Sequence, residues 1–133
     1  MKKDIENRLD IDHLMREFYS RATSDDVIGY IFTDVAKLDL EHHLPIIGDF
    51  WESMLFGTGV YQKHGRNPLM VHRDLHEKSA LTAAHFARWL ELFNYCVDKD
   101  FAGERAEFLK MRAKAIASRF QAVLDVEGIV ATA

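Results

Sequence analysis

The chain has 133 residues, of which 48% are hydrophobic and 29% charged, and its formal net charge is −4. This composition is typical of one globular domain, here 1–133 with an ordered core over about 5–127, and it excludes a disordered chain. The mild acidity argues against a nucleic-acid partner. One cysteine, Cys96, stands among apolar residues, which indicates a buried thiol in a cytoplasmic protein. We find no signal peptide and no apolar run of membrane-spanning length.

The first third of the chain shows helical periodicity and no strand alternation. A helix is predicted over 11–23, where apolar residues form one stripe and Asp10 is the expected N-cap. A second, short helix is expected over 26–32, with Asp25 as its cap.

A third helix is predicted to continue to about Thr58, because apolar pairs recur every four residues before Gly57 and Gly59 end it. Its first residue stays open at this point. Pro45 would suit a first turn, but it would disrupt a helix that began at Leu40.

The middle of the chain is expected to be an irregular loop over 59–67. Asn67 and Pro68 then have the N-cap and N1 types that open a helix, predicted here to run through Leu75. This helix is short yet rich in apolar residues, so something must pack against it.

The last third is predicted to hold two long helices. The first covers about 79–98 with Ser79 as its N-cap, and its apolar residues surround most of its circumference. The second covers about 103–127 and ends at Gly128, after which residues 129–133 are expected to fray. The fold class is therefore all-α.

The stretch MVHRDLHE raises two chemical readings. The His-Arg-Asp-Leu tetrapeptide opens the kinase catalytic loop, but that loop needs Asn seven residues after the histidine, where this chain has Ser79. A Gly-rich phosphate loop is also missing. His72 and His76 are spaced for a metal on one helical face, yet catalytic zinc needs three protein ligands and structural zinc four. A zinc-binding helical protein therefore remains an alternative without a full ligand set.

Tyr19 and Trp89 each lie on an apolar helical face and carry a polar tip that needs a partner when buried. Core filling and hydrogen bonding to a ligand in a shared cavity both explain them. His43 is predicted to face the core, and His42 to point away from it.

Four segments together resemble the truncated haemoglobins, most closely group III. They are FYSRATSDDVIGYIF, HLPIIGDFWESMLFGTG, NPLMVHRDL and HFARWLELF, and their order and spacing cover residues 5–125. The resemblance implies a two-over-two helical sandwich, the truncated globin fold, around haem b. Two positions depart from the usual pattern, namely Tyr30 where proline is common and Pro45 close after His43. The Gly-Gly motifs of groups I and II are absent, as is expected of group III.

The resemblance also implies roles for single residues. His72 matches the proximal histidine that ligates the haem iron, and Phe32 matches the phenylalanine that packs on the porphyrin. The positions that match the distal, ligand-facing side are Tyr19, His43, Ile47 and Trp89. Four polar side chains are expected to compete for the haem propionates, with no basis for choosing among them: Tyr61, His64, Arg66 and Arg73.

The expected ligands are diatomic gases, O₂, CO and NO. Polar distal donors favour redox or detoxification chemistry on peroxide or nitric oxide over bulk O₂ transport. Such turnover would need an external reductase, and the sequence does not decide whether it occurs. The competing hypothesis from another class is a non-haem helical adaptor in which His72 and Trp89 only pack.

Overall fold

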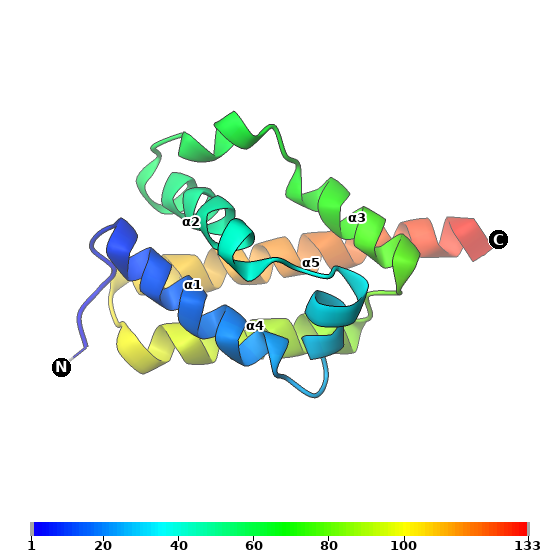
Figure 1. Cartoon of the computed structure of the whole chain (residues 1–133), viewed down its shortest axis with the longest axis horizontal. Helices are drawn as coiled ribbons and strands as arrows, with labels where there is room; N and C mark the ends of the chain where they lie inside the picture. The colour runs from blue at the N-terminus through cyan, green and yellow to red at the C-terminus, as the bar shows by residue number, and fades with distance from the viewer. Residues whose placement is uncertain (1, 133) are drawn as a thin grey trace.

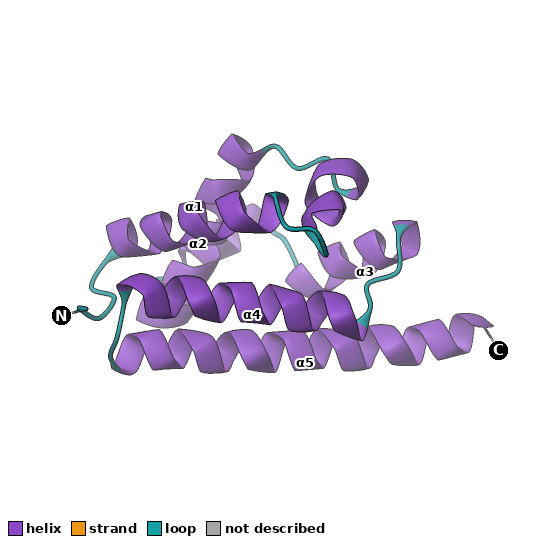
Figure 2. Cartoon of the chain, turned by 90° about the horizontal axis from the view of Figure 1, so that it is seen from below, coloured by secondary structure: helices purple, strands orange, loops and turns teal. Residues whose placement is uncertain are grey.

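Four long helices form two layers. The computed structural model describes residues 2–132, with side chains described for 2–124. Helices α1 (Arg8–Thr23) and α2 (Leu40–Phe56) lie over α4 (Ala83–Asp100) and α5 (Glu104–Thr132), as Figures 1 and 2 show. Each layer is a contacting pair, and α1 also packs on α4 and α2 on α5. Within the described residues the chain forms no strand, only an isolated bridge between Lys3 and Phe101.

Helix α1 begins one turn earlier than the predicted helix, and the predicted cap is wrong. The Asn7 side chain accepts a hydrogen bond from the backbone N–H of Asp10 at 3.2 Å and so is the N-cap. Asp10 lies in the first turn and accepts from the backbone N–H of Glu6 at 2.9 Å. The apolar pattern could not mark this turn, because its apolar residue, Leu9, is 76% exposed.

The short helix predicted over 26–32 lies further along the chain. Asp25 caps a turn instead. Its carboxylate accepts hydrogen bonds from the backbone N–H groups of Val27 and Ile28 at 3.0 and 3.1 Å. The regular segment that follows is η1, a π-helix over Ile31–Val35. π-helical turns are rare and often occur at functional sites, and this one carries Phe32.

Helix α2 begins at Leu40 despite the proline in its second turn, so the expectation that Pro45 would disrupt such a helix is wrong. Asp39 caps it by accepting from the backbone N–H of residue 42. Proline removes the backbone donor that would bond to the carbonyl of Glu41. Glu41 is exposed in the first turn, where water can hydrate that carbonyl. Gly57, at φ 67°, ends the helix as predicted.

The segment between α2 and α3 is more regular than expected. A 3-10 helix, η2, covers Val60–His64 within the predicted loop. Helix α3 (Pro68–Lys78) begins where the sequence predicts, since the Asn67 side chain accepts from the backbone N–H of Leu69 at 3.0 Å. It continues one turn past Leu75, the predicted end.

The predicted ends of the last two helices need correction. Ser79 is not the N-cap of α4 but the C-cap of α3. Thr82 caps α4 by accepting from the backbone N–H of His85 at 3.3 Å. Helix α5 does not stop at Gly128 but continues to Thr132, because an interior glycine costs a helix only about 1 kcal/mol. The expected fraying of Ala133 lies outside the described residues.

Candidate functional site

A hollow opens between the two layers and α3. It encloses about 1160 Å³ of empty space, open solvent at its mouth included. Apolar and aromatic side chains make up most of its lining, which suits a hydrophobic ligand. Every site residue predicted from the sequence lines it except His64 and Arg73.

His72 presents one free ring nitrogen to this cavity. Its Nδ1 lies 2.7 Å from the carbonyl oxygen of Pro68, one turn earlier in α3. A carbonyl can only accept, so Nδ1 carries the hydrogen and Nε2 keeps its lone pair. Burial lowers the pKa of His72, which favours the neutral ring. A neutral imidazole held by a backbone carbonyl is the usual arrangement of a metal ligand. The ring of Phe120, on α5, lies 4.8 Å away between centroids.

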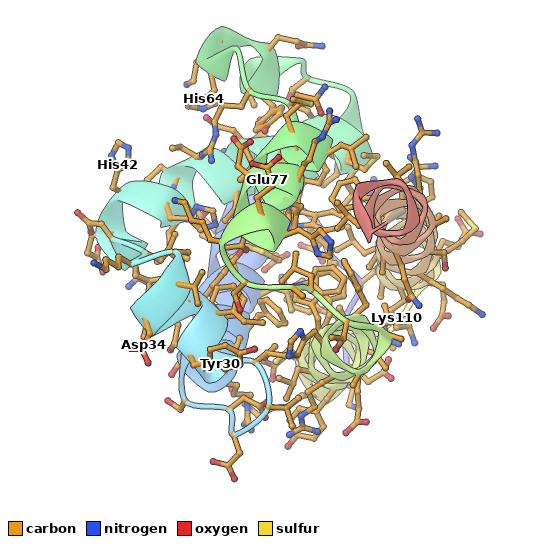
Figure 3. The ribbon with its side chains drawn as sticks, turned by 90° about the vertical axis from the view of Figure 1, so that its right-hand side faces the viewer. Tyr30, Asp34, His42, His64, Glu77 and Lys110 are labelled. Carbon is orange, nitrogen blue, oxygen red and sulfur yellow. The ribbon has the colours of Figure 1, made fainter. Side chains whose placement is uncertain are left out.

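Tyr19 and His43 meet on another side of the cavity. The Tyr19 hydroxyl and Nε2 of His43 are 3.0 Å apart, joining α1 to α2. Burial raises the pKa of Tyr19 and lowers the pKa of His43 to about 4. Both groups are therefore neutral at pH 7, and each can donate a hydrogen bond in apolar surroundings. As the helical register predicts, His42 is exposed, and Figure 3 shows it pointing away from the helices.

Aromatic rings fill the wall beside this pair. Trp89 stacks on Phe93 at 5.3 Å between ring centroids and meets Phe18 edge-on at 5.8 Å. Phe32 reaches Tyr19 from η1 at 5.8 Å, also edge-on. Rings packed edge-on and stacked in this way hold each other in place, so the wall is rigid where Trp89 faces the cavity.

Arg66 and Tyr61 border the cavity on the η2 side. The positive charge of Arg66 reaches deep groups: after burial, it is a further influence on the pKa of Tyr61, Tyr19 and His43. This charge lowers all three pKa values: it opposes the increase that burial causes in the tyrosine pKa values, and it adds to the decrease that burial causes in the histidine pKa. An arginine whose charge is directed at an apolar cavity is suited to an anionic group on a bound molecule.

His64 and Arg73 lie away from the cavity lining. Nε2 of His64 is 2.7 Å from the carboxylate of Asp49, a buried residue of α2. Arg73 contacts the sulfur of Met70 at 3.8 Å. Of the four side chains predicted as candidates to bind the haem propionates, Tyr61 and Arg66 therefore line the cavity, and His64 and Arg73 do not.

His85 also lines the cavity, although it is not among the site residues predicted from the sequence. Its Nδ1 accepts from the backbone N–H of Thr82 at 3.1 Å, so Nε2 carries the hydrogen of the neutral ring. That nitrogen lies 3.1 Å from the hydroxyl of Tyr30 and donates to it. This contact joins Tyr30 to α4, on the opposite side of the molecule from His64 (Figure 3).

A two-over-two helical sandwich with a neutral histidine in a large apolar cavity defines a globin-type protein. Residues 5–122 match the bacterial-like globin family. Over 127 residues the chain is 32% identical to the group 3 truncated haemoglobin ctb of Campylobacter jejuni, covering 93% of this chain and 95% of that one. The crystal structure of a group III truncated haemoglobin from the same organism superposes with a TM-score of 0.80, at 32% identity and the same coverage.

The chain belongs to the bacterial-like globins and is a group III truncated haemoglobin. The predicted family and the predicted truncated globin fold are confirmed, and the protein is a haem-binding globin. Because the chain belongs to this family, we discard the alternative hypotheses of a non-haem helical adaptor and of a zinc-binding helical protein. Among the described residues, no three His, Cys, Asp or Glu side chains are grouped to hold a metal ion. No helix in the described part of the chain could span a membrane.

Proposed function

We propose that the cavity binds haem b with His72 as the proximal ligand of the iron. The observation that carries this is the hydrogen bond from Nδ1 of His72 to the Pro68 carbonyl, which leaves Nε2 available as a ligand. Phe120 packs beside the ring and limits its rotation. The apolar lining suits a flat hydrophobic cofactor.

Arg66 and Tyr61 are proposed to hold the propionates. Both line the cavity at the η2 side, and Arg66 supplies the positive charge. Phe32 is proposed to pack against the porphyrin. His64 and Arg73, further from the lining, are left with indirect roles.

When bound to these residues, haem would supply an iron that can take O₂, CO or NO and the capacity for redox chemistry on them. The chain's own contribution is the donor set opposite, namely the Tyr19 hydroxyl, the His43 ring and the indole N–H of Trp89, with Ile47 beside them. Donors fixed in apolar surroundings interact strongly with a ligand that carries partial negative charge. We propose that they retain O₂ tightly, which suits detoxification of peroxide or nitric oxide with an external reductant better than O₂ transport.

Titration with hemin tests the proposal. The wild-type protein is expected to bind one equivalent and to develop a sharp Soret band. His72→Gly should bind hemin weakly, with an altered spectrum, and added imidazole should restore the wild-type spectrum by replacing the missing ring. His76→Gly is the matched control, since His76 lies on the same helix but outside the cavity lining. A His72→Gly spectrum identical to that of the wild type would exclude His72 as the ligand.

A further inference from the structure

A line of aromatic rings follows the wall of the cavity from α4 to the η2 side of the molecule. Its members, in order, are Trp89, Phe93, Trp51, Phe50 and Tyr61, and consecutive ring centroids lie 5.1–5.3 Å apart. Helix α4 contributes the first two rings, α2 the next two and η2 the last. Two tryptophans and a tyrosine thus alternate with two phenylalanines along what we call the aromatic line.

The alternation matters because these rings differ in how readily they lose an electron. Indole and phenol rings can give up one electron and regain it, whereas a phenylalanine ring only bridges its neighbours. Electron transfer slows steeply as rings move apart, so close contact decides whether a line of rings can conduct. Phe93 and Trp51 are 1% and 3% exposed, and the packed core around them keeps these contacts short. Trp51 is thus a buried, oxidisable ring to which the proposed function gives no role.

The aromatic line ends at a part of the surface where it can meet other molecules. Tyr61 is partly exposed, and its ring centroid lies 5.8 Å from that of His64, whose side chain is 21% exposed. The backbone N–H of Tyr61 donates to Oγ of Ser53 at 3.0 Å, and Nε2 of His64 lies 2.7 Å from the Asp49 carboxylate, so both residues are held in place. A planar aromatic molecule can stack against two fixed rings of this kind. Water also reaches this edge, so a phenol oxidised there can release its proton.

We propose that the aromatic line carries single electrons to the cavity from small phenolic reductants that dock at Tyr61. The proposal rests on the proposed function, since peroxide in the haem-loaded cavity is the oxidant, and it names the class of reductant and its place of contact. Two phenol molecules each lose one electron and their hydroxyl proton and become phenoxyl radicals. Hydrogen peroxide takes up the two electrons and two protons, its O–O bond breaks, and two water molecules form. Trp51 and Tyr61 lose and regain an electron in each transfer, and Tyr61 also releases and regains its hydroxyl proton.

The test locates the oxidised residue after hydrogen peroxide is added to the ferric, hemin-loaded protein without a reductant. A nitroso spin trap labels tyrosine and tryptophan radicals that reach the surface, and peptide mass spectrometry identifies the labelled residue. The wild type is expected to carry the label on Tyr61, although Tyr30 and Tyr95 are more exposed. Guaiacol added before the trap should remove the label, because this phenol returns the electron to Tyr61.

Two variants interrupt the aromatic line at neighbouring rings. Trp51→Phe removes the oxidisable ring in the middle and keeps an aromatic side chain, so most of the label on Tyr61 should be lost. Phe50→Leu removes the bridge between Trp51 and Tyr61 and should weaken the label as well. Both variants are expected to bind hemin with the Soret band of the wild type, which shows that they are folded.

Tyr95→Phe is the matched control, since Tyr95 is exposed on α4 outside the cavity lining, and it should leave the label on Tyr61 unchanged. A label spread over Tyr30 and Tyr95 according to exposure would overturn the proposal. A label of wild-type strength on Tyr61 in both line variants would also overturn it, because electrons would then pass directly between Tyr61 and the haem. Failure of the proposed function is seen separately, as a missing Soret band or a Soret band that peroxide does not change, and it would overturn this proposal too.

Discussion

At the scale of single residues, the proposed distal side of the cavity depends on polar atoms placed among aromatic rings. Tyr19 is 7% exposed, and its hydroxyl finds one partner, His43, at 3.0 Å. A tyrosine buried so fully loses water and must satisfy its hydroxyl inside the protein. When a polar ligand enters the cavity, the same hydroxyl can turn to it without any change in the helices.

Replacing Tyr19 or Trp89 by phenylalanine should therefore speed O₂ release. Each change removes a donor and keeps most of the ring, and one hydrogen bond in such surroundings contributes roughly 1–2 kcal/mol, or about 5- to 30-fold in rate. Stopped-flow mixing of the oxygenated protein with an O₂ scavenger measures the release. Tyr95→Phe is the control, because Tyr95 is 51% exposed on α4. Unchanged release in both cavity variants would remove these donors from the proposed distal site.

The sequence predicts these positions better than it predicts their partners. His72, Tyr19 and Trp89 could be singled out because a polar tip on an apolar helical face is unusual, and family resemblance then suggested roles. The contact between Phe120 and His72 could not be predicted, since periodicity does not reveal which helix crosses beside another. His85 could not be placed either: its contact with Tyr30 joins residues 55 positions apart, and no local pattern encodes such a contact.

At the scale of elements, Asp49 connects α1, α2 and η2. It is 7% exposed, and its carboxylate lies 2.6 Å from Arg8, 2.7 Å from His64 and 3.3 Å from Lys63. Burial alone would raise its pKa, but hydrogen bonds from the side chains of His64, Arg8 and Lys63 lower it from 3.8 to about 2. Through His64 the carboxylate holds η2, and η2 carries Tyr61 to the cavity.

Asp49→Asn should destabilise the protein by about 2 kcal/mol at pH 7, the order of the free energy that this pKa shift represents. Because the folded pKa is depressed, the contribution is present above pH 3.8 and is lost as pH falls toward 2. The difference in the free energy of unfolding between variant and wild type, measured in urea, should accordingly decrease as pH falls over that range. Glu41, like Asp49, is on α2; Glu41→Gln removes its exposed ion pair with Arg16 of α1 and should cost about 0–1 kcal/mol. Equal losses in the two variants would contradict the role of Asp49.

Helix ends show why elements are harder to delimit than to detect. The four long helices were expected from apolar spacing and α3 from the types of Asn67 and Pro68, but the predicted caps Asp10 and Ser79 were wrong. A cap depends on one side chain reaching one backbone N–H, and several Asp, Asn, Ser or Thr residues near each end can do so. At α5 the carboxylate of Asp4 accepts from the N–H groups of Arg105 and Ala106 at 3.0 and 2.9 Å. No local rule could find a cap about a hundred residues away.

At the scale of the whole molecule, the cavity proposed to hold haem takes the place of part of the core. The fully buried side chains, among them Phe18, Phe93 and Leu109, lie between α1, α4 and α5. Helix α3 contributes no buried residue, and among the long helices its main contact is with α5. A space of this size between apolar walls leaves side chains without packing partners, which destabilises a protein in proportion to the volume. Haem is thus expected to complete the fold as well as to serve the function.

Hemin should raise the urea midpoint of unfolding. The increase has two sources that can be separated, the filling of the cavity and the bond between iron and His72. A ligand that binds only the folded state adds about 2.7 kcal/mol when its free concentration is 100 times Kd. Metal-free protoporphyrin IX fills the same space without bonding to His72, so its effect measures packing alone. Hemin should stabilise the wild type more than protoporphyrin does, whereas His72→Gly should gain equally from both, because only the bond between iron and His72 distinguishes them. Equal gains from the two porphyrins in the wild type would show that His72 adds nothing to retention, and equal midpoints with and without hemin would show that the cavity needs no filling.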